Sequence, residues 1–289
     1  MTEGVSTVIE WLLDENNPAV RLRASAELKG QAHESADAAA WYKAFLPSDW
    51  MERKGLWSTY YLSGFAECGL TFADTGLEIK RAVGFGADAP FDCGCGDFMR
   101  LRALVRLGLG DYPAVASVIK RLPETQLPDG GFLCLHRLKK MDRVPKSCVK
   151  VNMHALMFAA ECAKKGIATD ITEPLVDYFW KHRLFYRTGE ANALILSARE
   201  GWRAVDAFYP FEVMRVGLAN IVESFCALGY GNDERLCEAW ELLEGKRNPE
   251  GKYLLGGTLT KSYLPKERVG APGKWVTLYA LLAKKERGA

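Results

Sequence analysis

The sequence contains no uninterrupted apolar run of the roughly 18 residues that a membrane-spanning helix needs. Its first residues have neither the basic region nor the apolar core of a secretion signal. It also lacks an excess of charge, because 38 basic side chains face 36 acidic ones and the net charge is +2. Proteins that bind nucleic acid use a cationic excess to displace counterions. We therefore expect a cytoplasmic protein that has no transmembrane span and does not bind nucleic acid.

Other missing features reduce the number of folds and reactions that the sequence allows. Strand patterns are nearly absent, and the one β-rich stretch, residues 193 to 196, lies within the long polar connection from 186 to 205. The chain has no Gly-rich phosphate loop, no dinucleotide fingerprint and no Ser-His-Asp arrangement. Its eight cysteines are too sparse in 289 residues for a small disulfide scaffold. We expect them to be thiols, either buried or bound to metal.

A glycine-anchored block occurs twice in the chain at one spacing. Residues 107 to 111, Leu-Gly-Leu-Gly-Asp, lead through an apolar helix to residues 126 to 132, Gln-Leu-Pro-Asp-Gly-Gly-Phe. Residues 228 to 232, Leu-Gly-Tyr-Gly-Asn, lead in the same way to residues 247 to 253. The two blocks start at 107 and 228, an offset of 121. Such a repeat predicts an array of helical hairpins, each of which buries its apolar face against its neighbours.

Strongly apolar helices alternate with more polar ones along the whole chain. We expect inner helices at 57–68, 98–107, 148–163, 212–228 and 274–285. We expect outer helices at 77–83, 112–122, 172–183 and 233–243, with further helices at 5–30 and 38–45. A Trp-x-Thr-x-Tyr pattern begins two of the inner helices, at Trp57 and Trp275. The alternation predicts an all-α protein, an α/α toroid of repeated helical hairpins with one ring of helices inside another.

The glycine turns carry a resemblance to a known family. Gln126-x-x-x-Gly130-x-Phe132 has the form of the Gln/Trp motif of squalene-hopene cyclases, and residues 247 to 253 are a degenerate copy. With residues 146–148, Lys-Ser-Cys, and 274–278, Lys-Trp-Val-Thr-Leu, they make residues 55 to 285 resemble small single-chain bacterial members of the prenyltransferase and squalene-oxidase repeat family. The resemblance implies a terpenoid-cyclase-like or protein-prenyltransferase-like toroid with a central, mostly apolar cavity.

The sequence also departs from that family. The Asp-x-Asp-Asp acid of the class II triterpene cyclases is missing, and so is the Asp-x-Cys pair with which protein prenyltransferases hold zinc. The Asn-Pro-Ala-Val-Arg run that starts at Asn17 resembles the opening of a HEAT repeat. We expect residues 1–289 to form a single domain, with 1–54 as a HEAT-like helical extension and 55–289 as the prenyltransferase-like repeats.

Cysteines near two predicted helix starts are candidate zinc ligands. Cys93 and Cys95 precede one inner helix and Cys148 begins the next, while Cys134 and His136 lie on the connection between them. Parallel inner helices would bring their N-termini to one end, where the helix dipole favours thiolates. A tetrahedral zinc site needs three or four such ligands. The alternative, thiols that only pack in the core, remains open.

Three further groups are candidate substrate-binding or catalytic residues. Aromatic residues that could line a lipophilic pocket and stabilise carbocations are Trp57, Tyr60, Tyr61, Tyr209 and Trp275. Cations that could neutralise a diphosphate are Lys139, Lys140, Arg143 and Arg215. Carboxylates whose pKa would rise in an apolar cavity, which would make them acids, are Asp92, Asp97 and Asp206. The competing interpretations are core packing for the aromatic residues and a solvated loop for the cations.

Two functions from different classes follow. The first is a protein that binds an isoprenoid or other apolar small molecule in a central cavity, with zinc as its cofactor and with a prenyltransferase-like or cyclase-like (transferase or lyase) activity. The second is a non-enzymatic, HEAT-like repeat scaffold that presents its helices to a protein partner. Aromatic enrichment favours the first hypothesis, and the missing acid motif favours the second.

Overall fold

The computed structural model describes residues 3–32, 34–86, 91, 93–134, 147–184, 216–257 and 267–288. Within these ranges the chain is mostly helical and contains no strand, only two isolated bridges, Arg247 with Tyr253 and Leu254 with Pro272. The all-α prediction is confirmed. The β-rich stretch at 193 to 196 lies outside the described residues. None of the described helices is long and apolar enough to cross a membrane.

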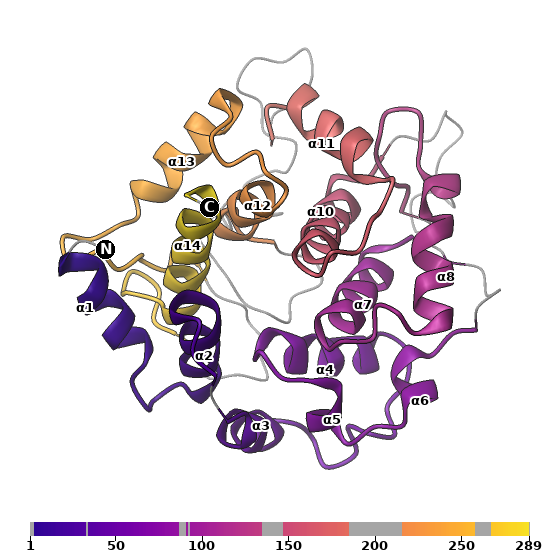
Figure 1. The fold of residues 1–289 in the computed structure, drawn as a ribbon, viewed down its shortest axis with the longest axis horizontal. Coiled ribbons are helices and arrows are strands. Elements are labelled where there is room, and N and C mark those ends of the chain that lie inside the picture. The colour runs from indigo at the N-terminus through magenta and orange to yellow at the C-terminus, as the bar shows by residue number, and fades with distance from the viewer. Residues whose placement is uncertain are drawn as a thin grey trace.

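The helices fall into two groups by position (Figure 1). Those nearer the middle are α2 (Pro18–Arg23), continued by the π-helical turn η1 (Ala24–Leu28), α4 (Leu56–Glu67), α7 (Cys95–Arg106), α10 (Val149–Lys164), α12 (Leu218–Ala227) and α14 (Lys274–Arg287). Those further out are α1 (Glu3–Leu12), α3 (Ala36–Lys43), α5 (Phe72–Thr75), α6 (Ile79–Val83), α8 (Pro113–Arg121), followed by the 3-10 turn η2 (Leu122–Thr125), α11 (Thr172–Lys181) and α13 (Cys237–Glu244), preceded by η4 (Glu234–Leu236). Most predicted helices lie within a few residues of these bounds.

The inner helices contact one another in chain order. Helix α4 packs on α7, α7 on α10, α10 on α12 and α12 on α14, and α14 in turn contacts α2 and η1. Helix α3 contacts both α2 and α4, so the series of contacts returns to its start. The inner helices are buried nearly all round, and α10 is the clearest case, with Leu156 and Phe158 fully covered. The first helices, expected as an extension, thus contact the last one.

Two inner helices begin at a glycine whose N–H is held by a side chain three residues on. In α7, Gly94 N–H donates to Asp97 Oδ2 at 2.9 Å, and in α12, Gly217 N–H donates to Asn220 Oδ1 at 3.3 Å. Such a bond satisfies one of the backbone donors that a helix start leaves without a partner. It also explains a misplaced boundary: the helix expected from residue 212 starts at Leu218, directly after this cap.

The two copies of the repeat share their backbone hydrogen bonds. Leu127 N–H donates to Gly131 O at 2.8 Å, and at the offset of 121 Asn248 N–H donates to Lys252 O at the same distance. The glycines of the two turns, Gly130 and Gly251, have φ of 89° and 84°. Such left-handed backbone is readily adopted by glycine. The glycine-anchored blocks therefore form the same turn twice.

The aromatic residue after each turn is tied to the next inner helix. Phe132 N–H donates to Asn152 Oδ1 at 2.8 Å, and Phe132 O accepts from Cys148 N–H at 2.8 Å. In the second copy Tyr253 N–H donates to Thr277 Oγ1 at 3.0 Å. Both rings are fully buried. The motif thus fixes the outer-to-inner connection, because each aromatic residue is bonded through its backbone and packed through its ring.

The first glycine turn, residues 126 to 132, also lies close to the outer helix α11. A Cβ on Gly130 would lie 2.0 Å from Pro174 O in α11, closer than real Cβ atoms come to other atoms. Gln126 Nε2 donates to Gly130 O at 2.7 Å and to Ile171 O at 3.1 Å, so its side chain joins the turn to the start of α11. The glycine is therefore required twice, by its φ and by the close approach.

We expect Gly130→Ala to destabilise the protein strongly. Gly108 is the matched control, because its φ is 90° and a Cβ there would meet nothing within 4 Å. Gly108→Ala should cost only the left-handed strain, about 1 kcal/mol of unfolding free energy. Gly130→Ala adds the clash with Pro174 and should cost at least about 2 kcal/mol more. Urea denaturation measures both, and equal losses would contradict the close approach.

Candidate functional site

The predicted aromatic residues that the structure describes divide between surface and core. Trp57 is 46% exposed at the first turn of α4, and its neighbour Leu56 is 49% exposed. Tyr60 is half-buried, with its ring 5.9 Å from that of Trp57. Tyr61 and Trp275 are buried in the core. The start of α4 therefore presents two large apolar side chains to solvent, with further rings behind them.

Three predicted metal-ligand cysteines lie around the first glycine turn. Cys148 is bonded through its N–H to Phe132, and the Phe132 ring packs on Phe98 with centroids 4.7 Å apart. Phe98 is one turn from Cys95 on α7, and Cys134 follows Phe132 by two residues. Burial, together with the nearby Cys148 and Cys134, raises the pKa of the Cys95 thiol to about 12. The three thiols therefore interact electrostatically.

Within the described part of the chain, these thiols do not form a metal site. Among the described residues, no group of three or more His, Cys, Asp or Glu side chains is arranged to hold a metal ion. The buried Cys93 Sγ lies 2.9 Å from Thr125 Oγ1. His136 lies outside the described residues. Zinc stays a prediction that these residues do not support.

Of the predicted acids and cations, the described part of the chain includes only Asp97. Asp97 accepts the Gly94 N–H and so acts as a helix cap. The other predicted residues of these groups, together with one aromatic residue, lie outside the described part of the chain: Asp92, Asp206, Lys139, Lys140, Arg143, Arg215 and Tyr209.

A second polar region, which the sequence did not predict, lies among the inner helices. We call it the charge network, and its members come from every inner element: Arg23 and Glu27 from α2 and η1, Glu67 from α4, Arg102 and Arg106 from α7, Glu161 and Lys164 from α10, Glu223 from α12 and Tyr279 from α14. Its four cations and four carboxylates balance. Neutrality and pairing are what allow so many charges to lie in the interior.

Glu67 contacts three other members of the network. Its carboxylate contacts Arg102, accepts from the Tyr279 hydroxyl and lies 3.6 Å from Arg23 Nη1. Arg23 also donates to Tyr279 Oη at 3.0 Å. The side chains of Arg23 and Glu67 are 0% and 1% exposed. One carboxylate therefore joins α4 to α7, α14 and α2.

The network continues through Arg106 and fixes the direction of the helices. Arg106 bonds Glu27 Oε1 at 3.1 Å and Glu161 Oε2 at 3.3 Å, and Lys164 contacts Glu223. These contacts bring the C-terminal turns of α4, α7 and α10 together, so the three helices run parallel. Their N-termini, with the exposed apolar residues and the three thiols, share the opposite end.

The cations control the protonation of the carboxylates. Burial alone would raise the pKa of Glu67, but Arg102, Arg106 and Arg23 outweigh it and lower the pKa to about 2. Burial opposes ionisation of Glu27 as well, yet Arg23 and Arg106 hold the pKa of this carboxyl far below its usual range. Both carboxylates thus stay ionised at any pH where the protein is expected to work.

Protein-family models, curated proteins and solved structures were compared with the chain, and none matches. The two ends of the inner helices differ in what they offer: paired charges at one end, and exposed apolar groups with thiols at the other. The second end therefore has apolar side chains and thiols that are not used up by ion pairing.

The lowered pKa of Glu67 predicts acid sensitivity. Its folded pKa lies below its unfolded value near 4.5, so its contribution is present above that value and is lost as the pH falls toward 2. Glu67→Gln should remove on the order of 3 kcal/mol at pH 7 and flatten the loss between pH 5 and 2. Glu241→Gln is the control, because Glu241 is an exposed residue of α13. Urea denaturation across this pH range that gave parallel curves for wild type and Glu67→Gln would contradict the assignment.

The raised pKa of Cys95 predicts slow alkylation. Only the thiolate reacts with iodoacetamide, and at pH 8 a group with a pKa of about 12 is almost wholly protonated. The exposed Cys237 is the internal comparison. Peptide mass spectrometry should show Cys237 modified well before Cys95 in the native protein, and the difference should vanish in urea. Fast native labelling of Cys95 would refute the predicted environment.

Proposed function

We propose that the chain is an α/α toroid that binds an apolar, isoprenoid-like small molecule at the end where its inner helices begin. The closed series of helix contacts supports the toroid. The placement of the charge network supports the choice of end, because its cations are already paired with carboxylates and offer an apolar ligand no favourable surface. The proposal includes the cytoplasm as the location.

The observation that carries the proposal is the exposure of Leu56 and Trp57 at the start of α4. Two adjacent large apolar side chains, each about half exposed, are unusual at the start of an otherwise buried helix. Covering them would release apolar surface from water, and each CH₂ group of a ligand that is buried contributes about 0.8 kcal/mol. A prenyl chain has enough such groups to bind without a specific polar contact.

The same end can also receive a charged head group. The N-termini of α4, α7 and α10 lie there, and backbone N–H groups at a helix start attract phosphate oxygens. The predicted cations at 139, 140 and 143 belong to the connection that leads into α10. A reaction is not part of the proposal. Asp97 caps α7, and the other predicted acids, Asp92 and Asp206, lie outside the described residues. Prenyltransferase-like or cyclase-like activity stays a prediction.

Titration with farnesyl diphosphate and with farnesol tests the binding, with Trp fluorescence as the readout. We expect saturable binding of both and tighter, salt-sensitive binding of the diphosphate. Leu56→Ala should weaken the binding of both ligands about threefold to tenfold, because it removes apolar contact area. Leu242→Ala on outer helix α13 is the matched control, since Leu242 is 43% exposed. It should leave both affinities unchanged.

The outcomes separate the parts of the proposal. Equal affinity for the two ligands would keep the apolar site and remove the diphosphate subsite. Equal effects of Leu56→Ala and Leu242→Ala would move the site away from α4. No saturable binding of either ligand would overturn the proposal.

One observation favours the scaffold as a second candidate. The exposed apolar side chains continue backwards along the chain from Leu56 to Met51 and Phe45, which are 41% and 36% exposed. An apolar surface spread over a segment of this length is typical of a protein–protein interface. In that case Leu56→Ala would weaken the binding of a protein partner, and farnesol would have no effect on that binding.

A further inference from the structure

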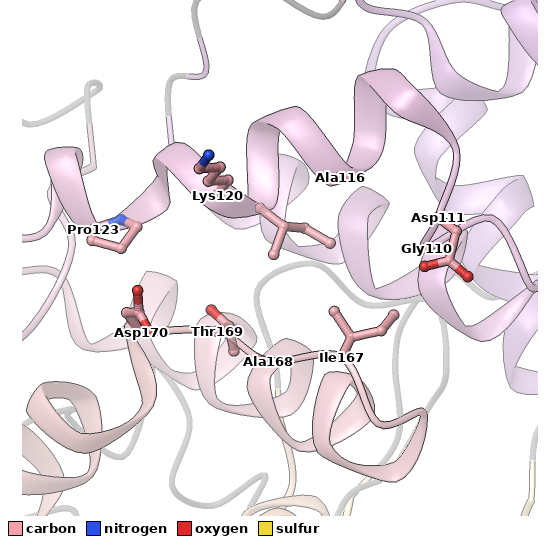
Figure 2. A pocket seen from close by; sticks show the side chains of 10 residues that line it. Gly110, Asp111, Ala116, Lys120, Pro123, Ile167, Ala168, Thr169 and Asp170 are labelled. Atoms are coloured by element: carbon pink, nitrogen blue, oxygen red, sulfur yellow. The ribbon is translucent and has the colours of Figure 1, made fainter.

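A groove of about 270 Å³ lies between α8 and residues 167–170, the connection from α10 to α11 (Figure 2). Its carboxylates, Asp111 and Asp170, are exposed, and the Thr169 hydroxyl is buried. The groove therefore offers a ligand only charges that are already solvated. None of its ten lining residues is a cysteine. More specific chemistry lies at the first glycine turn.

Cys134 and Cys148 lie at the two ends of the connection that leads from this turn into α10. Cys148 is the N-cap residue of α10, and its N–H donates to Phe132 O at 2.8 Å. Cys134 follows Phe132 by two residues, so both cysteines lie beside the same backbone hydrogen bond. Both are free thiols, and Cys148 is buried whereas Cys134 is half-buried. Of the two, Cys134 is therefore the more accessible to a small solute.

The second glycine turn has the same backbone arrangement at the equivalent positions. Gly273, the N-cap residue of α14, donates its N–H to Tyr253 O at 2.9 Å. In both copies the side chain four residues after the cap accepts the N–H of the aromatic residue. The two caps have φ of −97° and −104°. Gly273 is therefore the equivalent of Cys148, and Leu255, two residues after Tyr253, is the equivalent of Cys134.

The second copy gives the distance between these two positions. A Cβ on Gly273 would lie 3.4 Å from Leu255 Cβ. Disulfides join cysteines whose Cβ atoms are about 3.5 to 4.5 Å apart. The first copy has the same backbone hydrogen bond and a cysteine at both positions. Its two Cβ atoms are therefore expected to lie within the reach of a disulfide.

We propose that Cys134 and Cys148 form a reversible disulfide when the chain meets a hydroperoxide. The bond joins the residue that follows the first glycine turn to the first residue of α10. The connection between them, residues 135–147, becomes a covalently closed loop. The inference goes beyond the binding of an apolar ligand and does not rest on it.

The reaction balances with one molecule of hydrogen peroxide. The Cys134 thiolate attacks the peroxide, an S–O bond forms as the O–O bond breaks, and one water leaves with the thiol proton. The Cys148 sulfur then attacks the Cys134 sulfur, the S–S bond forms, and the S–O bond breaks. A second water leaves with the Cys148 proton. The two thiols lose two electrons, which reduce the peroxide to the two waters, and an added dithiol restores both thiols by exchange.

Peptide mapping of the full chain after native oxidation with hydrogen peroxide tests the pair. The remaining thiols are blocked with N-ethylmaleimide in urea, and the chain is cut with trypsin. The three thiols of this region then lie on different peptides: 122–137 with Cys134, 147–150 with Cys148, and 82–100 with Cys95. We expect the first two peptides to be joined, with a mass two hydrogens below their sum, and to separate after treatment with dithiothreitol.

Variants and stability give an independent readout. A closed loop of about 15 residues should lower the unfolding equilibrium constant about 100-fold, so oxidation should raise the urea midpoint. Cys134→Ser should remove both the joined peptides and this shift. Cys237→Ser is the matched control, because Cys237 is an exposed thiol elsewhere in the chain, and it should keep both. Cys95→Ser should also keep both, and circular dichroism checks that each variant is folded.

Three results would overturn the proposal. The first is a map in which peptide 82–100 is joined to either partner in place of the expected pair. The second is native oxidation that leaves all eight thiols titratable or that stops at an unlinked oxidised Cys134. The third is a urea midpoint that does not rise when the bond forms, which would show that the native fold does not bring the two sulfurs together. None of them would affect the titration with farnesyl diphosphate, because that titration uses the reduced chain.

Discussion

The carboxylate of Glu67 is the group on which the arrangement of the inner helices depends. It lies at the last turn of α4 and is in contact with Arg102 of α7, Arg23 of α2 and Tyr279 of α14. These partners come from the start, the middle and the end of the chain. A buried carboxylate that loses its partners is strongly destabilising, so any other order of these helices would leave a charge uncompensated.

The rest of the network extends this constraint around the inner helices. Arg106 lies between Glu27 and Glu161, and Lys164 reaches Glu223, so η1, α7, α10 and α12 are joined by charge as well as by apolar packing. Well-packed apolar residues could match such pairs in stability. Ion pairs add selectivity among alternative arrangements of the helices. Two similar apolar faces can replace one another in a packing arrangement more easily than two differently charged faces can.

One end of the inner helices is therefore used for structure, and the other end is the one that we propose for binding. The connections from an inner helix to the next outer helix are short, as between Glu67 and Phe72 or between Arg106 and Pro113. Those from an outer helix to the next inner helix are longer, as between Lys181 and Leu218. Function concentrates on long connections held by a rigid frame. The apolar residues at the start of α4 lie at that end.

Much of this fold could be predicted from the sequence because its signals are local. The periodicity of apolar residues predicted the positions of the helices. The glycine turns predicted the repeat, because the backbone hydrogen bonds that Leu127 and Asn248 make within these turns span only a few residues. The start of α12 was misplaced because apolar residues continue before its cap at Gly217. The short α5, held by Thr71 and Asp74, was missed because four residues carry no period.

The charge network could not be predicted in the same way. Arg23 with Glu27 and Arg102 with Arg106 have the spacing of residues on an exposed helical face, and nothing local marks them as buried. Their partners on other helices lie 35 to 256 residues away. The thiols at the first turn were expected to meet because they precede parallel helices, whereas the raised pKa of Cys95 depends on a burial that only the fold provides.

A double-mutant cycle between Arg23 and Tyr279 tests the central claim most directly, because these residues tie the first inner helix to the last. Urea denaturation of Arg23→Met, Tyr279→Phe and the double variant gives the coupling free energy. If the two side chains bond in the buried network, the coupling should exceed about 1 kcal/mol. Additive losses, within about 0.3 kcal/mol, would show that the two helices are not joined in this way and would contradict the account.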